Sequence, residues 1–449
     1  MHGAEGGEWV PQVIFGWDPL WVATLLLIIT YAVIISEKFN RAIIALLGAG
    51  LMIFAGVLNQ QAAVQGIDFN TIALLTGMMV LVAITGKSGI FQYVAIWATK
   101  RVKANPPGIL LMLSVVTAVF SALLDNVTTV LLVVPVTLLI TEELRIKAYP
   151  FLFAEILASN IGGTATLIGD PPNILIGSAA NLSFNDFITN LAPIAAIIFI
   201  ITFGGIYLFW GRTLRTTEER KRRVMNFDER EAIKDKKLLK QSLGVLSLVI
   251  LGFVVGHPLG YEPGSIAMSG AALLLLLHNF DRDAEEQSHN VHHTFGEVEW
   301  VTIFFFMGLF VIVAGVERAG LLHLLADRLL AFTGGDLATT AITVLWASAI
   351  LSAILDNIPF VATMIPLINS MAPQFGGPEG LLPLWWALSL GACLGGNGSL
   401  IGASANLTVV AFAERAKQPI KFLPFMKLAF PIMLGTIVLA HIYIYLRYL

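Results

Sequence analysis

Ten apolar segments, each close to the length needed to cross a bilayer, recur along this chain of 449 residues. The hydrocarbon core of a bilayer is about 30 Å thick and takes roughly 20 apolar residues per helix. Composition agrees, because 57% of the residues are hydrophobic, only 13% are charged and the mean hydropathy is +0.80. The sequence therefore predicts an all-α polytopic membrane protein. The expected transmembrane helices are residues 19–36, 41–57, 71–86, 150–180, 187–210, 241–257, 263–278, 300–316, 382–412 and 425–446.

Two further apolar stretches, residues 107–140 and 339–370, have an unusual length. Each would form a single helix of about 50 Å at 1.5 Å per residue, yet each is too short for two full spans and a turn. Polar pairs interrupt both stretches, Asp125-Asn126 in the first and Asp356-Asn357 in the second. We therefore expect two re-entrant helical hairpins, whose tips must be buried in protein or line a wet cavity.

Most of the 27 lysines and arginines fall in the loops of one face when the N-terminus is placed outside. Basic residues favour the cytoplasmic side, so we expect both termini outside the cytoplasmic membrane. Lys38 and Arg41 then lie in the first inner loop. The N-terminal MHGAEGGEWV has no lysine or arginine, so it lacks the basic region of a secretory signal, and the first apolar segment is expected to remain.

Three polar regions leave alternatives open. The charged segment 211–240 is either a solvated cytoplasmic linker or a site for a partner or lipid headgroups. His289, His292 and His293, in the inner loop 278–293, are either exposed or a metal or pH-sensing site. Lys87 and Arg318 end matching spans just before amphipathic segments, where each either anchors a horizontal arm helix or attracts substrate.

The chain contains an internal repeat. TIALLTGMMVLVAITGKSG (71–89) aligns with TIFFFMGLFVIVAGVERAG (302–320), and LLDNVTTVLLVVP (123–135) with ILDNIPFVATMIP (354–366). GGTATLIGDPPN (162–173) aligns in turn with GGNGSLIGASAN (395–406). We infer two repeats joined by the linker 211–240. Residues 1–210 hold the hairpin 107–140 and the broken helix 150–180, and residues 241–449 hold the hairpin 339–370 and the broken helix 382–412.

Each half contains five spans, so the second half crosses the membrane upside down. Inverted repeats place hairpin tips and broken helices around a site near the bilayer midplane, which is the geometry of alternating access. The sequence therefore predicts a transporter and no enzyme. The competing class is a receptor or structural protein without turnover. Intramembrane carboxylates and broken helices would lower the stability of such a protein without serving its function.

Glycine, hydroxyl and amide residues sit where the spans break, and they are the expected substrate ligands. Glycine and proline permit unwinding, and the freed backbone groups can bind an anion or a cation. The alternative is that the small residues only allow close helix packing. The candidate binding residues are Asn126, Thr128, Thr129, Asn160, Gly162, Gly163, Thr164, Thr166, Asn173, Asn357, Gly395, Gly396, Asn397, Ser399 and Asn406.

Four carboxylates are candidates for proton or cation coupling, because an ionisable residue within the membrane is costly. Asp125 and Asp356 are symmetric and could equally cap the second helix of each hairpin. Asp170 has Ala403 as its counterpart, and this asymmetry suits a proton site. Glu155 is a further proton candidate, or else a residue that extends to the lipid edge. With Cys393 as the one cysteine and a net charge of −3, we expect no metal, no cofactor and no nucleic-acid partner.

At LLDNVTTVLLVVP, SNIGGTATLIGDPPNIL, ILDNIPFVATMIP and LGACLGGNGSLIGASANL the chain resembles the ion transporter superfamily. It is most similar to the ArsB-type arsenite/antimonite permeases and the P-protein-like transporters. The resemblance implies the fold of the divalent-anion/sodium symporters, with a scaffold domain, usually dimeric, and a transport domain that moves as an elevator. A homodimer and a cytosolic ATPase are partners to be considered.

The expected function is proton-coupled efflux of arsenite or antimonite. Arsenite is a small uncharged trihydroxide that asparagine, threonine and serine can bind through oxygen. A neutral solute gains nothing from the membrane potential, so uphill export requires a coupled ion. The runner-up is a sodium/proton antiporter. A carboxylate transporter is less favoured, because the hairpins lack the Ser-Asn-Thr of the sodium-coupled dicarboxylate branch and we expect no arginine in the site to clamp a carboxylate.

Overall fold

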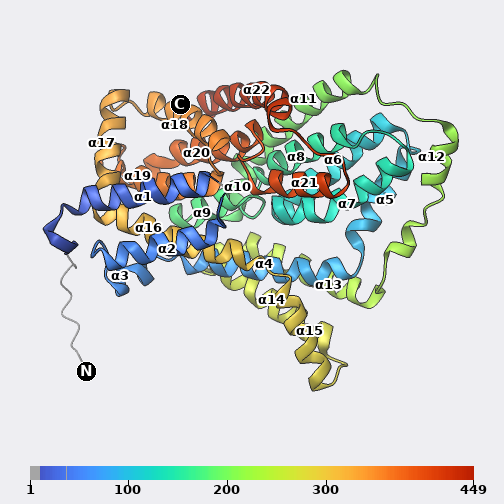
Figure 1. The fold of residues 1–449 in the computed structure, drawn as a ribbon, viewed down its shortest axis with the longest axis horizontal. Helices are drawn as coiled ribbons and strands as arrows, with labels where there is room; N and C mark the ends of the chain where they lie inside the picture. Colours follow the sequence, from blue (N-terminus) through green and yellow to red (C-terminus); the bar gives the residue numbers. More distant parts are fainter. Residues whose placement is uncertain (1–10, 37) are drawn as a thin grey trace.

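The computed structural model describes residues 11–36 and 38–449, and the regular secondary structure of this part of the chain is helical (Figure 1). The segment MHGAEGGEWV, on which the expected absence of a secretory signal rests, lies outside the described residues. Eight of the described helices are long and apolar enough to cross a membrane, and two shorter apolar helices precede them. The protein is therefore an all-helical, multi-pass membrane protein.

The order of helices among the described residues is similar in the two halves of the chain, with eleven helices in the first series and ten in the second. The first series is α1 (Pro19–Ile35), α2 (Arg41–Phe54), α3 (Gln60–Gln65), α4 (Phe69–Lys87), α5 (Ile90–Arg101), α6 (Pro106–Leu123), α7 (Asn126–Glu143), α8 (Tyr149–Gly163), α9 (Pro171–Ala180), α10 (Phe184–Asn190) and α11 (Ala192–Trp210). The second series is α13 (Lys236–Gly256), α14 (Pro263–Asn279), α15 (Ala284–Gly296), α16 (Trp300–Arg318), α17 (Leu321–Thr333), α18 (Leu337–Ile354), α19 (Asn357–Ser370), α20 (Leu382–Gly395), α21 (Ser404–Arg415) and α22 (Phe422–Tyr448). Between them lies α12 (Glu218–Met225).

Six helices, α1, α2, α4, α13, α14 and α16, form what we call the support bundle, in which the two halves of the chain contact each other crosswise. α4 packs on α14 and α16 packs on α2. Glycine allows both contacts, because a Cβ on Gly77 would lie 2.6 Å from the backbone of Ala267, and one on Gly308 would lie 2.6 Å from that of Ala45. Ala45 of α2 and Ala267 of α14 therefore occupy equivalent positions in the two halves of the chain.

The remaining long helices form the hairpin bundle, α6–α9, α11 and α18–α22. α6 packs on α8 and α18 packs on α20 within each half, whereas α7 contacts α21 and α9 contacts α19 between the halves. Trp385 and Trp386 of α20 are among its largest fully buried side chains. In Figure 1 this bundle lies above α2, α4, α14 and α16. The spans expected at 150–180 and 382–412 are each interrupted midway, by residues 164–170 and by residues 396–403.

Helix α2 is short. Its 14 residues extend about 21 Å at 1.5 Å per residue, less than the thickness of a bilayer core of about 30 Å. α2 is therefore shorter than a full membrane span. Arg41 is its first residue, and Asn40 caps the helix by accepting a hydrogen bond from the backbone of Ala42 over 2.9 Å.

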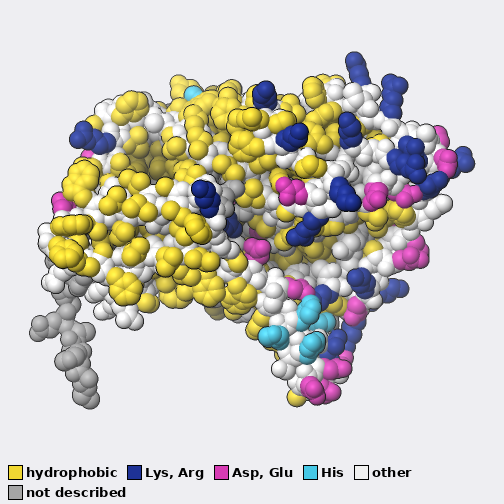
Figure 2. All heavy atoms as spheres, in the orientation of Figure 1, with side chains coloured by type: hydrophobic (Ala, Val, Ile, Leu, Met, Phe, Trp, Pro, Cys, Tyr) yellow, Lys and Arg dark blue, Asp and Glu magenta, His cyan; other side chains and the backbone are white. Residues whose placement is uncertain are grey.

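The two arm segments are helices, α5 and α17, and each begins at a glycine in the left-handed region, Gly89 and Gly320. The charged linker lies against the first of them. Lys100 of α5 donates to the Glu229 carboxylate over 2.5 Å and to the carbonyl of Phe227 over 3.0 Å. Most of the lysines and arginines visible in Figure 2 lie over the end of the molecule where α5 and α12 are found.

Candidate functional site

The tips of the two hairpins are helix starts capped by aspartate. Asp125 precedes α7, where its Oδ1 accepts from the Thr128 backbone over 2.8 Å and its Oδ2 accepts from the Thr128 hydroxyl. Asp356 precedes α19 and accepts from the Ile358 backbone over 3.1 Å. Capping therefore accounts for the contacts of Asp125 and for one contact of Asp356, while a coupling role for either stays a prediction.

An asparagine side chain closes each helix break. Asn173 in α9 and Asn406 in α21 donate their amide hydrogens to backbone carbonyls of the unwound segments before them. The four carbonyl oxygens lie 2.8 to 3.2 Å from the amide nitrogens and belong to Thr164, Thr166, Gly396 and Ser399. Freed carbonyls without a partner would be costly in the interior, so these amides stabilise both breaks.

Small residues bring the broken helices against the hairpins. A Cβ on Gly162 would lie 2.2 Å from the carbonyl oxygen of Ala118 in α6, and one on Gly395 would lie 2.6 Å from that of Ala349 in α18. The hydroxyls of two candidates also donate to hairpin carbonyls, Thr166 over 2.6 Å and Ser399 over 2.5 Å. Close packing, the alternative we considered for these small residues, thus accounts for the contacts of both glycines.

Asp170 lies where both hairpins and the first broken helix meet. Its Oδ1 accepts from the Asn126 amide over 3.1 Å and from the Asn357 amide over 3.3 Å. The carboxylate is fully buried, and its Oδ2 has no hydrogen-bond partner among the described residues. A buried carboxylate oxygen without a donor is unfavourable, so this atom is poised to take up a proton or a ligand.

Carboxamides continue from Asp170 into the second half of the chain. Asn160 of α8 accepts from Asn126 over 3.2 Å and donates to the side-chain oxygens of Asn397 and Asn406, each over 3.0 Å. Asn397 Nδ2 is buried without a partner in the described chain. The predicted residues Asn126, Asn160, Asn357, Asn397 and Asn406 are thereby brought into one network around Asp170.

Four helices begin at this network. Asn126 and Asn357 are the first residues of α7 and α19, Asp170 immediately precedes α9, and Ser404 opens α21. Ser404 Oγ donates to Asp356 Oδ2 over 3.0 Å. The N-terminal end of a helix carries partial positive charge, which stabilises an anion such as the Asp170 carboxylate or a bound oxyanion.

Glu155 is buried in α8. Its side chain accepts from the Thr137 hydroxyl of α7, and its second oxygen, Oε2, has no partner in the described chain. The residue is 1% exposed, so the alternative that it extends to the lipid edge is wrong. The helix before the break is buried along its whole length, which places this acid in the protein interior.

The expectation that no arginine lies in the site is also wrong. Arg41 Nη1 lies 2.8 Å from Asp356 Oδ2 and 2.5 Å from Ser404 Oγ, while Nη2 lies 3.2 Å from Thr302 Oγ1. The guanidinium also stands over the ring of Phe305, 5.0 Å from its centroid. The distribution of loop charges predicts Arg41 at the membrane surface, whereas in the structure it contacts the tip of the second hairpin.

The Arg41–Asp356 pair borders a cavity of about 280 Å³ between α1 and α2 on one side and the second hairpin on the other. Tyr31 of α1 spans this boundary. Its hydroxyl donates to the carbonyl of Pro359 over 2.9 Å and lies 3.1 Å from Thr363 Oγ1. The cavity thus adjoins the second hairpin tip, with Asp356 in its lining.

The remaining candidate binding residues differ from one another in their contacts. Thr129 is buried with no partner for its hydroxyl in the described chain, and the Thr164 hydroxyl donates to the carbonyl of Asn160 over 2.7 Å. Gly163 and Gly396 pack against the backbone of Gly169 and Gly402 in their own breaks. The sequence analysis missed Ser389, which donates to Asn173 Oδ1 over 2.6 Å. Ser389 lies inside an apolar stretch and belongs to no repeated motif, so the sequence offered no signal for it.

Lys87 and the histidines do not form a metal site. Lys87 Nζ donates to Thr294 Oγ1 over 3.0 Å and lies 3.3 Å from His293 Nδ1. The expected loop around His289, His292 and His293 is mainly helix α15, which extends away from the rest of the molecule in Figure 1. In the described part of the chain, no group of three histidine, cysteine or acidic residues is placed to hold a metal ion.

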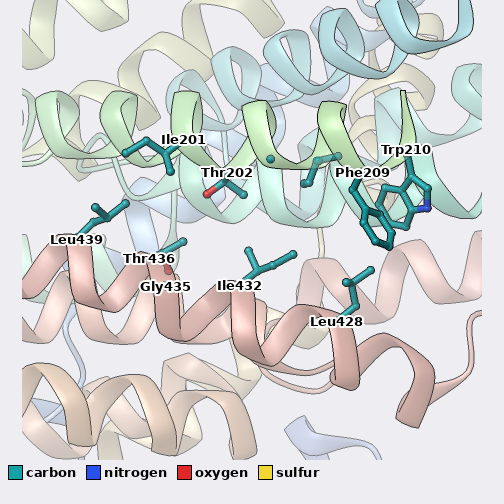
Figure 3. Close-up of a pocket in the computed structure, with 11 residues that line it drawn as sticks. Ile201, Thr202, Phe209, Trp210, Leu428, Ile432, Gly435, Thr436 and Leu439 are labelled. Carbon is teal, nitrogen blue, oxygen red and sulfur yellow. The ribbon is translucent and has the colours of Figure 1, made fainter. Parts of the chain in front are cut away.

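A larger space is unrelated to these polar residues. Between α11 and α22 runs a groove of about 450 Å³, lined by apolar side chains together with Thr202, Thr436 and Trp210 (Figure 3). Thr436 donates to the carbonyl of Met433 in its own helix. The groove holds no carboxylate and no carboxamide, so it lacks the chemistry of a polar solute site.

Comparison with known proteins gives a family and a fold. The model of the citrate transporter family matches residues 31–391. An uncharacterized transporter of Mycobacterium bovis is 41% identical over 431 residues, which cover 95% of this chain and 98% of that protein. A 46 kDa membrane protein of Mycobacterium leprae is 40% identical over 432 residues, 95% of this chain and 99% of the relative.

The resemblance to P-protein-like transporters is confirmed. The human P protein is 32% identical over 495 residues, covering 92% of this chain and 58% of the P protein. Among solved structures, the YdaH transporter of Alcanivorax borkumensis aligns with a TM-score of 0.59 over 96% of this chain and 99% of that chain. At 13% sequence identity this likeness concerns the fold alone. A specific relation to ArsB-type permeases stays a prediction.

Proposed function

Because this chain belongs to the citrate transporter family, a family of transporters and not of enzymes, we propose that it is a proton-coupled secondary transporter with Asp170 as the coupling residue. The observation that carries the proposal is that amides from both hairpins, Asn126 and Asn357, donate to one oxygen of this buried carboxylate. Protonation of Asp170 would change the strength of both contacts at once, and so would couple proton binding to the positions of both tips.

The architecture that we propose has ten transmembrane helices, two re-entrant hairpins and both termini outside. The halves, residues 1–210 and 241–449, form inverted repeats joined by the cytoplasmic linker 211–240. The crosswise pairs α4 with α14 and α16 with α2 support this interpretation. The support bundle would act as the scaffold and the hairpin bundle as the moving transport domain of an elevator.

Arsenite or antimonite exported from the cytoplasm is the first candidate substrate. At neutral pH arsenite is an uncharged trihydroxide, whose hydroxyls can both donate to and accept from carboxamides. The network of Asn126, Asn160, Asn357 and Asn397 offers such groups without a thiol. Asn397 Nδ2, buried with no partner in the described chain, is a free donor for a solute oxygen.

A carboxylate anion such as citrate is the second candidate, and Arg41 is the observation that favours it. A guanidinium can bind a carboxylate through two hydrogen bonds, and helix starts favour anions. Arg41, Ser404 and the starts of α7, α9, α19 and α21 supply both features. The match to a family described as citrate transporters adds weight. Sodium/proton antiport, the runner-up from the sequence, is favoured by the three acids Asp125, Asp170 and Asp356.

Transport into proteoliposomes with an imposed pH gradient distinguishes these candidates. Arsenite, radiolabelled citrate and sodium-22 are offered in turn, and one of them should accumulate until a protonophore collapses the gradient. Asp170→Asn keeps the shape of the side chain but cannot ionise, so we expect gradient-driven accumulation to fall at least about tenfold. Glu155→Gln removes the other fully buried candidate acid, and comparison with it shows whether the loss is specific to Asp170. Accumulation at the wild-type level in Asp170→Asn would refute the proposed coupling residue.

A further inference from the structure

We propose that Arg41 is a positioning residue that holds the second hairpin against the support bundle through its ion pair with Asp356. We call this ion pair the latch, and it exists on one face of the molecule only. The inference rests on the proposed function, because it concerns the movement of one bundle against the other. It adds a residue that holds one orientation of the transport cycle in place.

The contacts of Arg41 cross the boundary between the bundles. Its guanidinium stays attached to the support bundle through Thr302 and the ring of Phe305, both in α16. From there it reaches Asp356 at the tip of the second hairpin and Ser404 at the start of α21. Side-chain exposure is 23% for Arg41 and 15% for Asp356, so the pair is largely shielded from solvent.

The correspondence between the two halves of the chain shows that the latch has no counterpart in the other half. Ala45 of α2 corresponds to Ala267 of α14, because each is the backbone contact of the matching glycine, Gly308 or Gly77. Arg41 begins α2 four residues before Ala45, and Pro263 begins α14 four residues before Ala267. Proline has no group that can bind a carboxylate, so the face opposite Arg41 lacks an equivalent cation at this position.

The first hairpin agrees with this asymmetry. The described contacts of the Asp125 carboxylate are with Thr128 of its own helix, whereas Asp356 binds a cation of the other bundle. Removing one partner of a largely shielded ion pair is costly, because it leaves the other charge without compensation. Any movement that separates the second hairpin from α2 must break it. The latch therefore stabilises the arrangement seen here relative to the opposite one.

A cysteine at Ile354 can report the position of this hairpin. Ile354 lies two residues before Asp356, lines the cavity and is 53% exposed. The native cysteine, Cys393, is buried, and the protein without the added cysteine gives the background. Labelling by a water-soluble maleimide is measured on Ile354→Cys in lipid nanodiscs. There the reagent reaches both faces of the bilayer, so the result does not depend on how the protein is oriented in it.

We expect Arg41→Gln to lower the labelling rate of Ile354→Cys at least threefold, because the latched arrangement that opens this cavity is less populated. Asp356→Asn should lower it to the same extent, and the double variant no further, since both remove one interaction. Lys38→Gln, a neighbouring cation without an ion pair in the described chain, is the matched control. Size-exclusion profiles and melting temperatures check that each variant is folded.

A labelling rate unchanged by Arg41→Gln would overturn the latch. So would additive effects of Arg41→Gln and Asp356→Asn, which would show two independent perturbations. The readout needs neither solute nor a pH gradient, so it remains informative if Asp170→Asn transports like the wild type. In that event the proposed coupling would fail while the latch stands.

Discussion

At the scale of single residues, the candidate site is a set of amides arranged around one acid. Asn126 and Asn357 supply the two donors to Asp170 Oδ1, and either deletion leaves a buried acceptor with one donor. Losing one hydrogen bond to a charged group costs about 1.5–3 kcal/mol. We expect Asn126→Ala and Asn357→Ala each to lower solute flux in proteoliposomes at least about tenfold while the protein remains extractable and monodisperse. Asn369→Ala, an exposed asparagine in the same helix as Asn357, should transport normally. Wild-type flux in both site variants would show that these amides are dispensable.

Residue types in the site could be predicted from the sequence, but their partners could not. The repeated Asp-Asn and Gly-Gly motifs identified the tips and breaks, since polar residues inside apolar stretches stand out. The roles of Asn173 and Asn406 in closing the breaks depend on backbone carbonyls, which carry no sequence signal. The contact of Arg41 with Asp356 joins residues 315 positions apart in the chain, so it depends on how the two halves pack, which composition does not encode.

At the scale of elements, the two arm helices begin alike but have different surroundings. A Cβ on Gly89 would lie 1.7 Å from the carbonyl oxygen of Ala232 in the linker, whereas one on Gly320 would meet nothing within 4 Å. Both glycines have positive φ, so alanine brings backbone strain of about 1–2 kcal/mol at either site. Only Gly89→Ala must also displace the linker, whose Lys234 backbone donates to the Ser88 carbonyl over 3.0 Å. We expect Gly89→Ala to lower the melting temperature more than Gly320→Ala and to hasten tryptic cleavage within 211–240. Equal cleavage rates in the two variants would mean that the linker is not held at Gly89.

Helices were the most predictable level of structure. The residues of the hairpin expected at 107–140 form α6 and α7, and the span expected at 19–36 is α1, because long apolar runs determine both and a proline begins α6 and α1. The region around the histidines was expected to be a loop and is mainly α15, where Asp283 caps the helix by accepting from the Glu286 backbone over 2.8 Å. An aspartate three residues before a glutamate was a helix-start signal that the polar composition obscured.

At the scale of the whole molecule, orientation is the most direct test of the proposed inverted architecture. Asn226 is exposed in the charged linker, and Gln61 is exposed in α3 within the loop expected outside. We expect an impermeant maleimide to label Gln61→Cys but not Asn226→Cys in intact cells, and the reverse in everted vesicles. Basic residues of the linker set this preference, since they are retained on the cytoplasmic side. Labelling of Asn226→Cys in intact cells would invert the topology.

The asymmetry between Asp170 and Ala403 has a consequence for how such a protein could arise. Two identical halves related by a twofold axis would carry any acid at this position twice, and both acids would compete for hydrogen bonds from Asn126 and Asn357. Like charges at a buried centre oppose each other's ionisation. Once a duplicated gene is fused into one reading frame, each copy mutates alone, and a single acid can be kept where a symmetric ancestor had to keep two or none. Fusion thus permits a centre that titrates once, which no assembly of identical halves can have.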